Sequence, residues 1–120
     1  MRFPQVGASE QDGRLRGMSG RTVFFERLEL DRLLHFYGRM VAAGEWRDYA
    51  LDALPDRALF SVYRRASEAP LYQIEKCPDD ARRRGAYAVR AVDGRILRRG
   101  HDLTRVLAVL EPKRMRVVAE

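Results

Sequence analysis

The sequence predicts an α+β fold with two layers, in which an antiparallel sheet of about five strands is covered on one face by two helices. Three observations support this prediction. Apolar residues recur at helical spacing in two stretches, and the short runs between those stretches alternate apolar and polar residues. The connections between the runs are short, which favours a meander in which neighbouring strands pair.

The chain has 120 residues, enough for one domain with a substantial core. We assign residues 21–112 to that domain, residues 1–20 to a disordered N-terminal tail, and residues 113–120 to a C-terminal tail or short strand. No apolar run approaches the roughly 20 residues of a membrane span. The single cysteine, Cys77, excludes an internal disulfide and indicates a reducing compartment, so we expect a cytoplasmic protein with no membrane partner.

The first helix is predicted from about Leu28 to Ala43, because apolar side chains recur there at helical spacing. Carboxylates in its first turns suit the helix dipole, and Gly44 is a suitable C-terminal cap. Before it, residues 22–25 form either an edge strand or a staple. Gly38 lies inside the helix at a cost of about 1 kcal/mol relative to alanine, which predicts close packing against a strand.

Alternation predicts the strands that follow, with their apolar side chains directed to one face. They are Trp46–Leu54, Ala58–Arg65 and Leu71–Cys77, followed by a polar loop, Pro78–Gly85, and a hairpin over Tyr87–His101. A second helix then begins at a cap formed by Asp102 or His101. Its apolar stripe is Leu103, Val106, Leu107 and Leu110.

Asp93 and Gly94 are predicted to close the hairpin as a two-residue type I′ turn, which needs positive φ at both positions. The inner face then carries Tyr87, Val89, Ala91, Ile96 and Arg98, and the outer face carries Ala88, Arg90, Val92, Arg95, Leu97 and Arg99. A shift of one residue would exchange the faces. On the inner face, Arg98 is expected to form a buried ion pair with Glu75 or Asp102.

The net charge of +6 is unevenly distributed. Residues 58–101 hold ten basic residues against five acidic ones, whereas residues 21–57 hold six against seven. Arginine accounts for 21 of the 23 basic residues, a ratio that codon usage in a GC-rich genome explains. The clustering needs a separate explanation, and the planar guanidinium fork is suited to phosphate or carboxylate recognition.

An arginine-rich sheet face with its adjoining loop therefore predicts a binding module for a polyanion, either the backbone of RNA or DNA or an acidic protein surface. The candidate binding residues are Arg65, Arg82, Arg83, Arg84, Arg90, Arg95, Arg99 and His101, with Tyr63 as a candidate for base stacking. The arginine run in the loop is either a phosphate clamp or a solvated segment neutralised by Asp79 and Asp80. His101 and Asp102 form either an anion site or an ordinary N-cap.

Catalytic motifs are absent from the sequence, which has no nucleophile elbow and no phosphate-binding loop. His35, Cys77 and His101 lack the spacing of a metal site. We therefore expect no metal, no cofactor and no enzymatic activity. An enzyme would need a pocket that gathers Tyr63, Arg65, Glu75 and His101.

A protein-interaction or adaptor domain is the alternative function, with the chain either a monomer or a homodimer. Its contact surface would involve Trp46, Phe36 and neighbouring apolar side chains. Self-association and capture of a defined protein would distinguish this function from polyanion binding.

Five long runs of the sequence carry a resemblance to a known family. They are VFFERLEL (23–30), YGRMVAAGEWRDYALD (37–52), FSVYRRASEAPLYQIEK (60–76), GAYAVRAVDG (85–94) and LRRGHDLTRVLAVLE (97–111). In these runs the chain resembles DUF2794, a small alphaproteobacterial family of unknown function. The resemblance implies a cytoplasmic bacterial protein and brings no activity, cofactor or catalytic residue with it.

Overall fold

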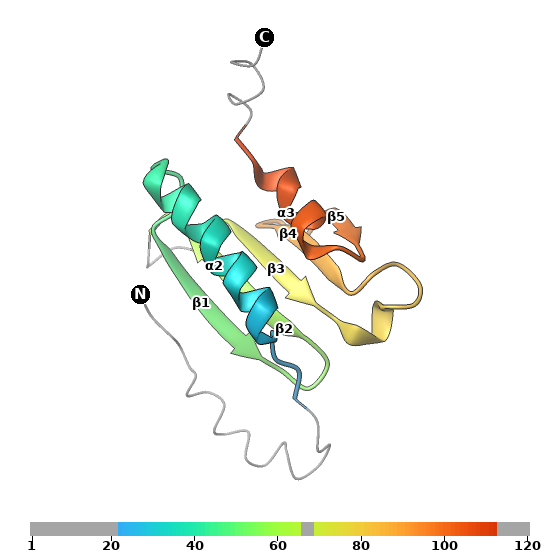
Figure 1. Ribbon diagram of the computed structural model, residues 1–120. Helices are drawn as coiled ribbons and strands as arrows, with labels where there is room; N and C mark the ends of the chain where they lie inside the picture. Colours follow the sequence, from blue (N-terminus) through green and yellow to red (C-terminus); the bar gives the residue numbers. More distant parts are fainter. Residues whose placement is uncertain (1–21, 66–68, 113–120) are drawn as a thin grey trace.

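A five-stranded antiparallel meander forms one layer of the protein, and two helices on the same side of the sheet form the other (Figure 1). This arrangement confirms the predicted α+β fold. The computed structural model describes residues 22–65 and 69–112. The two predicted tails, 1–20 and 113–120, lie outside the described residues.

The strands pair in chain order, and each neighbouring pair is antiparallel. They are β1 (Asp48–Ala53), β2 (Ala58–Tyr63), β3 (Tyr72–Lys76), β4 (Tyr87–Ala91) and β5 (Ile96–Gly100). The alternation predicted for the first three strands is confirmed, because Tyr49, Phe60 and Ile74 all belong to the buried core. The helices cover one face of the sheet, so the side chains that alternate with these core residues lie on the uncovered face.

Helix α2 (Arg27–Ala42) begins with a capping box, in which the Glu29 side chain accepts a hydrogen bond from the Glu26 amide. The helix ends before Gly44, whose φ of 80° matches the predicted C-terminal cap. Residues 22–25 form no strand. Phe25 is instead buried in the core just before the helix, so the staple alternative holds.

Gly38 does not pack closely against a strand, contrary to our expectation. A Cβ atom built at this position meets no atom within 4 Å, and the residue is exposed. The glycine faces solvent because the buried side of α2 is carried by Leu33, Phe36 and Met40. Its helix-weakening effect therefore has no compensating contact among the described residues.

The core lies between α2 and the sheet and is rich in aromatic rings. Tyr37 of α2 meets Tyr49 of β1 at a ring-centroid distance of 4.9 Å, and Tyr49 stacks on Phe60 of β2 at 5.1 Å. Trp46, which we expected at an interaction surface, is only 3% exposed. Its ring packs edge-on against Phe36 at 5.6 Å, so the tryptophan stabilises the core.

The second helical segment spans the predicted apolar stripe but changes geometry along its length. Helix α3 (Leu103–Leu107) continues as the 3₁₀ turn η2 (Ala108–Leu110). Asp102 is the N-cap, because its carboxylate accepts hydrogen bonds from the amides of Thr104 and Arg105 at 2.9 and 3.3 Å. The segment lies over β4 and β5 beside α2 (Figure 1).

The hairpin between β4 and β5 is not a type I′ turn. Gly94 has a positive φ, whereas the φ of Asp93 is negative. The amide of Ala91 donates a hydrogen bond to the carbonyl of Arg95, so the loop between them has three residues. The register then pairs Arg90 with Ile96, and a bulge at Leu97 restores the predicted pairing of Val89 with Arg98. The bulge exchanges two side chains, because Ile96 is exposed while Leu97 packs against the core.

The predicted polar loop after β3 contains a short 3₁₀ turn, η1 (Pro78–Asp80). The last residue of this loop, Gly85, has a φ of 106° and lies directly against the backbone of Gly100 at the end of β5. A Cβ atom at Gly85 would overlap that backbone. This contact holds the loop beside the end of β5.

Candidate anion-binding face

The face of the sheet away from the helices carries two rows of side chains that run across the strands. One row is Asp52, Leu59, Glu75, Ala88 and Arg99, and the next is Ala50, Ser61, Gln73, Arg90 and Ile96. At the centre of the first row, Glu75 is only 3% exposed, although no helix covers it. Side chains of its neighbours on the sheet therefore shield this carboxylate from water.

Three arginines surround the Glu75 carboxylate. Arg90 Nη2 donates to Glu75 Oε1 at 2.7 Å, and Arg57 Nη1 approaches the same oxygen at 3.5 Å. Arg99 Nη2 lies 3.5 Å from Oε2. A buried carboxylate must be paired to remain charged, and here the partners come from the β1–β2 turn, β4 and β5.

A second carboxylate, Asp80, gathers arginines from the loop. Arg99 Nη1 lies 3.2 Å from Asp80 Oδ2, while Arg83 and Arg84 approach Oδ1 at 3.6 and 3.5 Å. The guanidinium of Arg99 therefore bridges the two carboxylates. Its side chain is largely buried, whereas those of Arg83 and Arg84 are mostly exposed.

The resulting arginine network contains five guanidinium groups and two buried carboxylates, and its members are Arg57, Arg83, Arg84, Arg90, Arg99, Glu75 and Asp80. Asp56 adds a third, more exposed carboxylate that bonds to Arg57 and, as the main cause, raises the pKa of that arginine. The five guanidinium groups of the network still outnumber these three carboxylates. The buried carboxylates hold the guanidinium groups in place without neutralising all of them.

The structure brings together two of the three outward arginines of the predicted hairpin. Arg90 and Arg99 both reach Glu75. Arg95 was expected on the same face, but it is opposite Ala91 and pairs with Asp93 in the turn at 3.2 Å. The three-residue loop explains the difference, because it shifts Arg95 by one position relative to β4.

Arg98 does not form the buried ion pair that we expected. The residue is exposed, and it makes no ion pair within the described part of the chain. Glu75 is instead contacted by Arg99, one position later, and Asp102 caps α3. Because β5 is an edge strand, a long side chain on its inner face can reach solvent past the helices.

The other candidate residues lie outside the arginine network. Tyr63 is half-buried on the uncovered face, about 13 Å along β2 from Leu59 in the row of Glu75. Arg65 is exposed after the end of β2, and Arg82 is exposed in the loop beside Arg83. His101 is exposed after β5, and the side chain that caps α3 is that of Asp102.

Sequence reasoning missed Arg57 as a member of the network. This arginine lies in the turn before β2, two positions before Leu59, which pairs with Glu75. Alternation therefore puts Arg57 on the uncovered face, next to the glutamate. A register for β2 and β3 would have been needed to detect it from the sequence.

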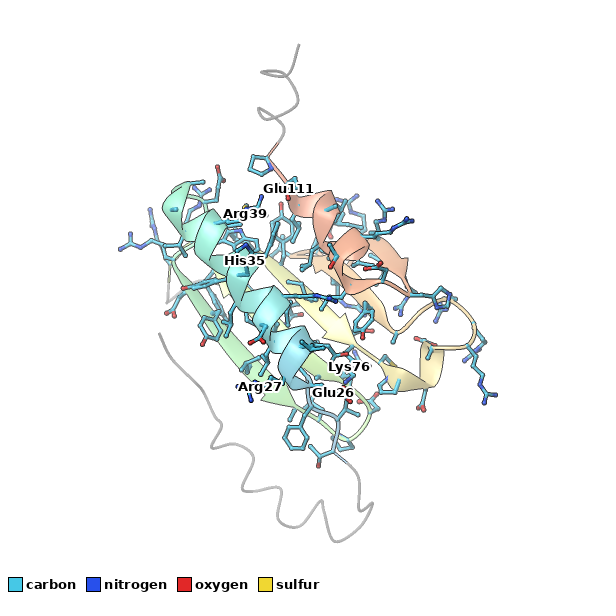
Figure 2. All side chains as sticks on the ribbon, viewed as in Figure 1. Glu26, Arg27, His35, Arg39, Lys76 and Glu111 are labelled. Atoms are coloured by element: carbon cyan, nitrogen blue, oxygen red, sulfur yellow. The ribbon has the colours of Figure 1, made fainter. Side chains whose placement is uncertain are left out.

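A separate cluster ties the first turn of α2 to the sheet. Lys76 Nζ donates to Glu29 Oε1 at 2.8 Å and to the carbonyl of Phe24 at 2.9 Å, and the Tyr87 hydroxyl donates to Glu29. Figure 2 shows Lys76 beside Glu26 at the start of the helix. This cluster lies on the helix side of the sheet, away from the arginine network.

Hydrogen bonding and burial shift the ionisation of this cluster. Burial alone would raise the pKa of Glu29, but hydrogen bonds from Lys76 and Tyr87 outweigh it and leave the pKa below 4.5. Burial, with the hydrogen bond to Glu29, raises the pKa of Tyr87 to about 12. The ionised carboxylate and the neutral phenol are therefore the forms that the folded protein prefers.

The three residues considered as metal ligands do not come together. His35 is exposed on α2, His101 is exposed after β5, and Cys77 is half-buried after β3. Within residues 22–65 and 69–112, no three side chains of histidine, cysteine, aspartate or glutamate form a metal-binding group. Burial raises the pKa of Cys77, which disfavours the reactive thiolate.

Comparisons with known proteins give one match. A family profile described as "Protein of unknown function (DUF2794)" matches residues 23–107. Searches of curated proteins and of solved structures found no match. Over the part of the chain that the structure describes, no helix has the length and apolar character needed to span a membrane.

Proposed function

The chain belongs to the DUF2794 family, whose function is unknown, and we propose that it is a non-enzymatic module that binds the phosphate backbone of RNA or DNA. The arginine network carries this proposal. Five guanidinium groups converge on two buried carboxylates at one sheet face and its adjoining loop, with positive charge in excess. Such a module would act in the cytoplasm of a bacterium, where nucleic acid is abundant.

Ordered guanidinium groups are well suited to phosphate. A guanidinium has five N–H donors in a fixed fork, so an arginine held by a carboxylate on one side can still present donors on the other. Arg83 and Arg84 have largely exposed side chains beside Asp80, and these exposed donors are the ones that a phosphate would meet first. Prior ordering by Asp80 reduces the entropy lost on binding.

A single strand suits this face better than a duplex. The arginine network runs across strands β3 to β5 and the β1–β2 turn on the uncovered sheet face, and Tyr63 of β2 lies on the same face. An aromatic ring beside a row of cations is the arrangement on which unstacked bases and their phosphates lie in single-strand binders. If about four phosphates are contacted, affinity should fall with a log–log salt slope of about −3.

The test measures binding of a fluorescent single-stranded RNA by anisotropy over a range of salt concentrations. We expect R83E/R84E to weaken binding by at least about tenfold at low salt and to flatten the salt slope. The control variant R27E/R47E has the same charge change at exposed positions, in the first turn of α2 and just before β1. Its affinity should stay close to that of the wild type, and circular dichroism verifies that both variants fold.

A polyglutamate peptide distinguishes nucleic acid from an acidic protein surface. Carboxylates meet the same guanidinium forks, but without the regular phosphate spacing, so we expect RNA to compete the peptide away easily. Equal loss of RNA binding in R83E/R84E and in R27E/R47E would show attraction to net charge alone and would contradict the proposed site. RNA binding that is independent of salt would contradict it as well.

A further inference from the structure

Gln73 lies on the uncovered sheet face between the arginine network and Tyr63. It is half-buried on β3, two positions before Glu75 and therefore about 7 Å from it along the strand. Its register partners are Arg90 on β4 and Ser61 on β2. Tyr63 follows Ser61 by two positions, which makes it a diagonal neighbour of Gln73 on the same face. One amide therefore separates the cationic side of this face from its aromatic side.

A hydrogen bond to a buried hydroxyl holds the Gln73 amide in place. Its Nε2 donates to Ser61 Oγ at 3.0 Å, and Ser61 is only 2% exposed. A glutamine side chain on a sheet surface otherwise has several rotamers available, and a ligand must overcome that entropy when it binds. Because the Gln73 amide is ordered beforehand, this cost is reduced.

Two groups of the same amide remain without a partner in the described part of the chain. A glutamine amide has two N–H donors and one carbonyl acceptor. The bond to Ser61 uses one N–H, and the other N–H and Oε1 meet no described residue. An ordered, half-buried acceptor beside a donor is a pair of groups that one ligand can satisfy together.

We propose that Gln73 reads the bases of the bound strand and prefers adenine, an inference that rests on the proposed function. Phosphates are drawn to the guanidinium groups on one side of Gln73, and the flat face of a base stacks on Tyr63 on the other. The edge of that base then lies toward the amide. Adenine presents its 6-amino donor beside a ring nitrogen acceptor, so Oε1 accepts from the amino group while Nε2 donates to the ring nitrogen.

Ser61 is the positioning residue of this site. Its bond to Nε2 fixes which end of the amide carries the acceptor, while the arginine network fixes the side on which the phosphates lie. A base that presents a carbonyl where adenine presents its amino group would set two acceptors against each other. The discrimination therefore depends on Gln73 for the contacts and on Ser61 for their direction.

The test compares two single-stranded RNAs of equal length by fluorescence anisotropy, one built from adenosine and one from purine riboside, which lacks only the 6-amino group. The wild type should bind the adenosine strand about fivefold more tightly, as expected for one hydrogen bond between neutral groups. Q73M keeps a side chain of similar length but has no amide, so it should bind the two strands equally. S61A keeps the amide but releases it, so its preference should be smaller than that of the wild type.

The control variant T104V removes a hydroxyl on α3, on the helix side of the sheet, and should keep the wild-type preference. Circular dichroism verifies that the variants fold, and S61A, a smaller change, decides the question if Q73M does not. Failure of the wild type to bind either strand would overturn the proposed function and this role of Gln73 with it. Equal binding of both strands by the wild type, or a full preference in Q73M or S61A, would overturn base reading alone and leave phosphate binding in place.

Discussion

At the scale of single residues, two glycines have opposite effects on the same fold. Gly85 is required by its conformation and by its contact with the Gly100 backbone. Gly38 has no such requirement, since it is exposed in the middle of α2 with open space where a Cβ would be. The first glycine holds the arginine loop beside β5, whereas the second only weakens a helix.

Alanine at each position should shift stability in opposite directions. Gly38→Ala should raise the free energy of unfolding by up to about 1 kcal/mol, because alanine favours the helix and meets no atom. Gly85→Ala should lower it by more than about 2 kcal/mol, because a side chain there is strained and overlaps Gly100. Urea unfolding of both variants measures this, and shifts of the same sign would contradict the assigned roles.

At the scale of elements, the start of α2 is held against β3 and β4 by hydrogen bonds to one carboxylate. Glu29 accepts from its own capping box, from Lys76 on β3 and from Tyr87 on β4. Two regions of sequence more than 45 residues apart are thereby joined. Because the pKa of Glu29 is lowered, the stability contributed by its charge is present above pH 4.5 and is lost as the pH falls below that value.

The phenol of Tyr87 should give the opposite limit at alkaline pH. Its pKa is raised from 10 to about 12, so the folded state prefers the neutral form, and this stabilisation is lost as the pH rises from 10 towards 12. The stability advantage of the wild type over Tyr87→Phe should therefore be constant below pH 10 and shrink above it. Urea unfolding against pH measures this difference.

Tyr72→Phe is the matched control, because Tyr72 lies on the neighbouring strand and its hydroxyl makes no hydrogen bond to a described residue. A narrowing in Tyr87→Phe that is absent from Tyr72→Phe would assign the effect to the phenol that donates to Glu29. A Tyr87→Phe difference that stays constant through this range would mean that the phenol is not held neutral by the fold.

At the scale of the whole molecule, the arginine network joins the β1–β2 turn, three strands and the η1 loop through Glu75 and Asp80. Each of these elements contributes only some of the residues of the network. A buried charge with several partners depends on all of them being in place. Loss of one charge in the network should therefore disturb both the uncovered sheet face and the loop.

Removing the central charge should therefore destabilise the fold. Glu75→Gln leaves Arg99, whose side chain is mostly buried, with only Asp80 as an ion-pair partner among the described residues. It should lower the free energy of unfolding by about 3 kcal/mol. Asp56→Asn removes a carboxylate from the rim of the same network, where exposed pairs contribute about 0.5 kcal/mol. Thermal and urea unfolding compare the two variants, and equal losses would show that burial of Glu75 is energetically unimportant.

The local sequence was a good guide where periodicity decides structure and a poor one where register decides it. The first helix, the alternation of β1 to β3 and a helix cap at Asp102 or His101 were all predictable from neighbouring residues, and the structure selects Asp102 as the cap. The hairpin was wrong by one position near its turn, because the Asp-Gly signal does not distinguish a two-residue loop from a three-residue loop with a bulge. That single shift moved Arg95 off the uncovered face.

By itself, the sequence determined the two-layer fold, the order of its elements and the concentration of net positive charge in residues 58–101. These properties depend on the spacing of apolar residues and on composition, which are local. Only the tertiary structure decided that Glu75 and Asp80 are buried and that five arginines from four separate segments converge on them. The physical reason is that a charge pair depends on distance in space, and the register and loop contacts that set this distance join residues far apart in the chain.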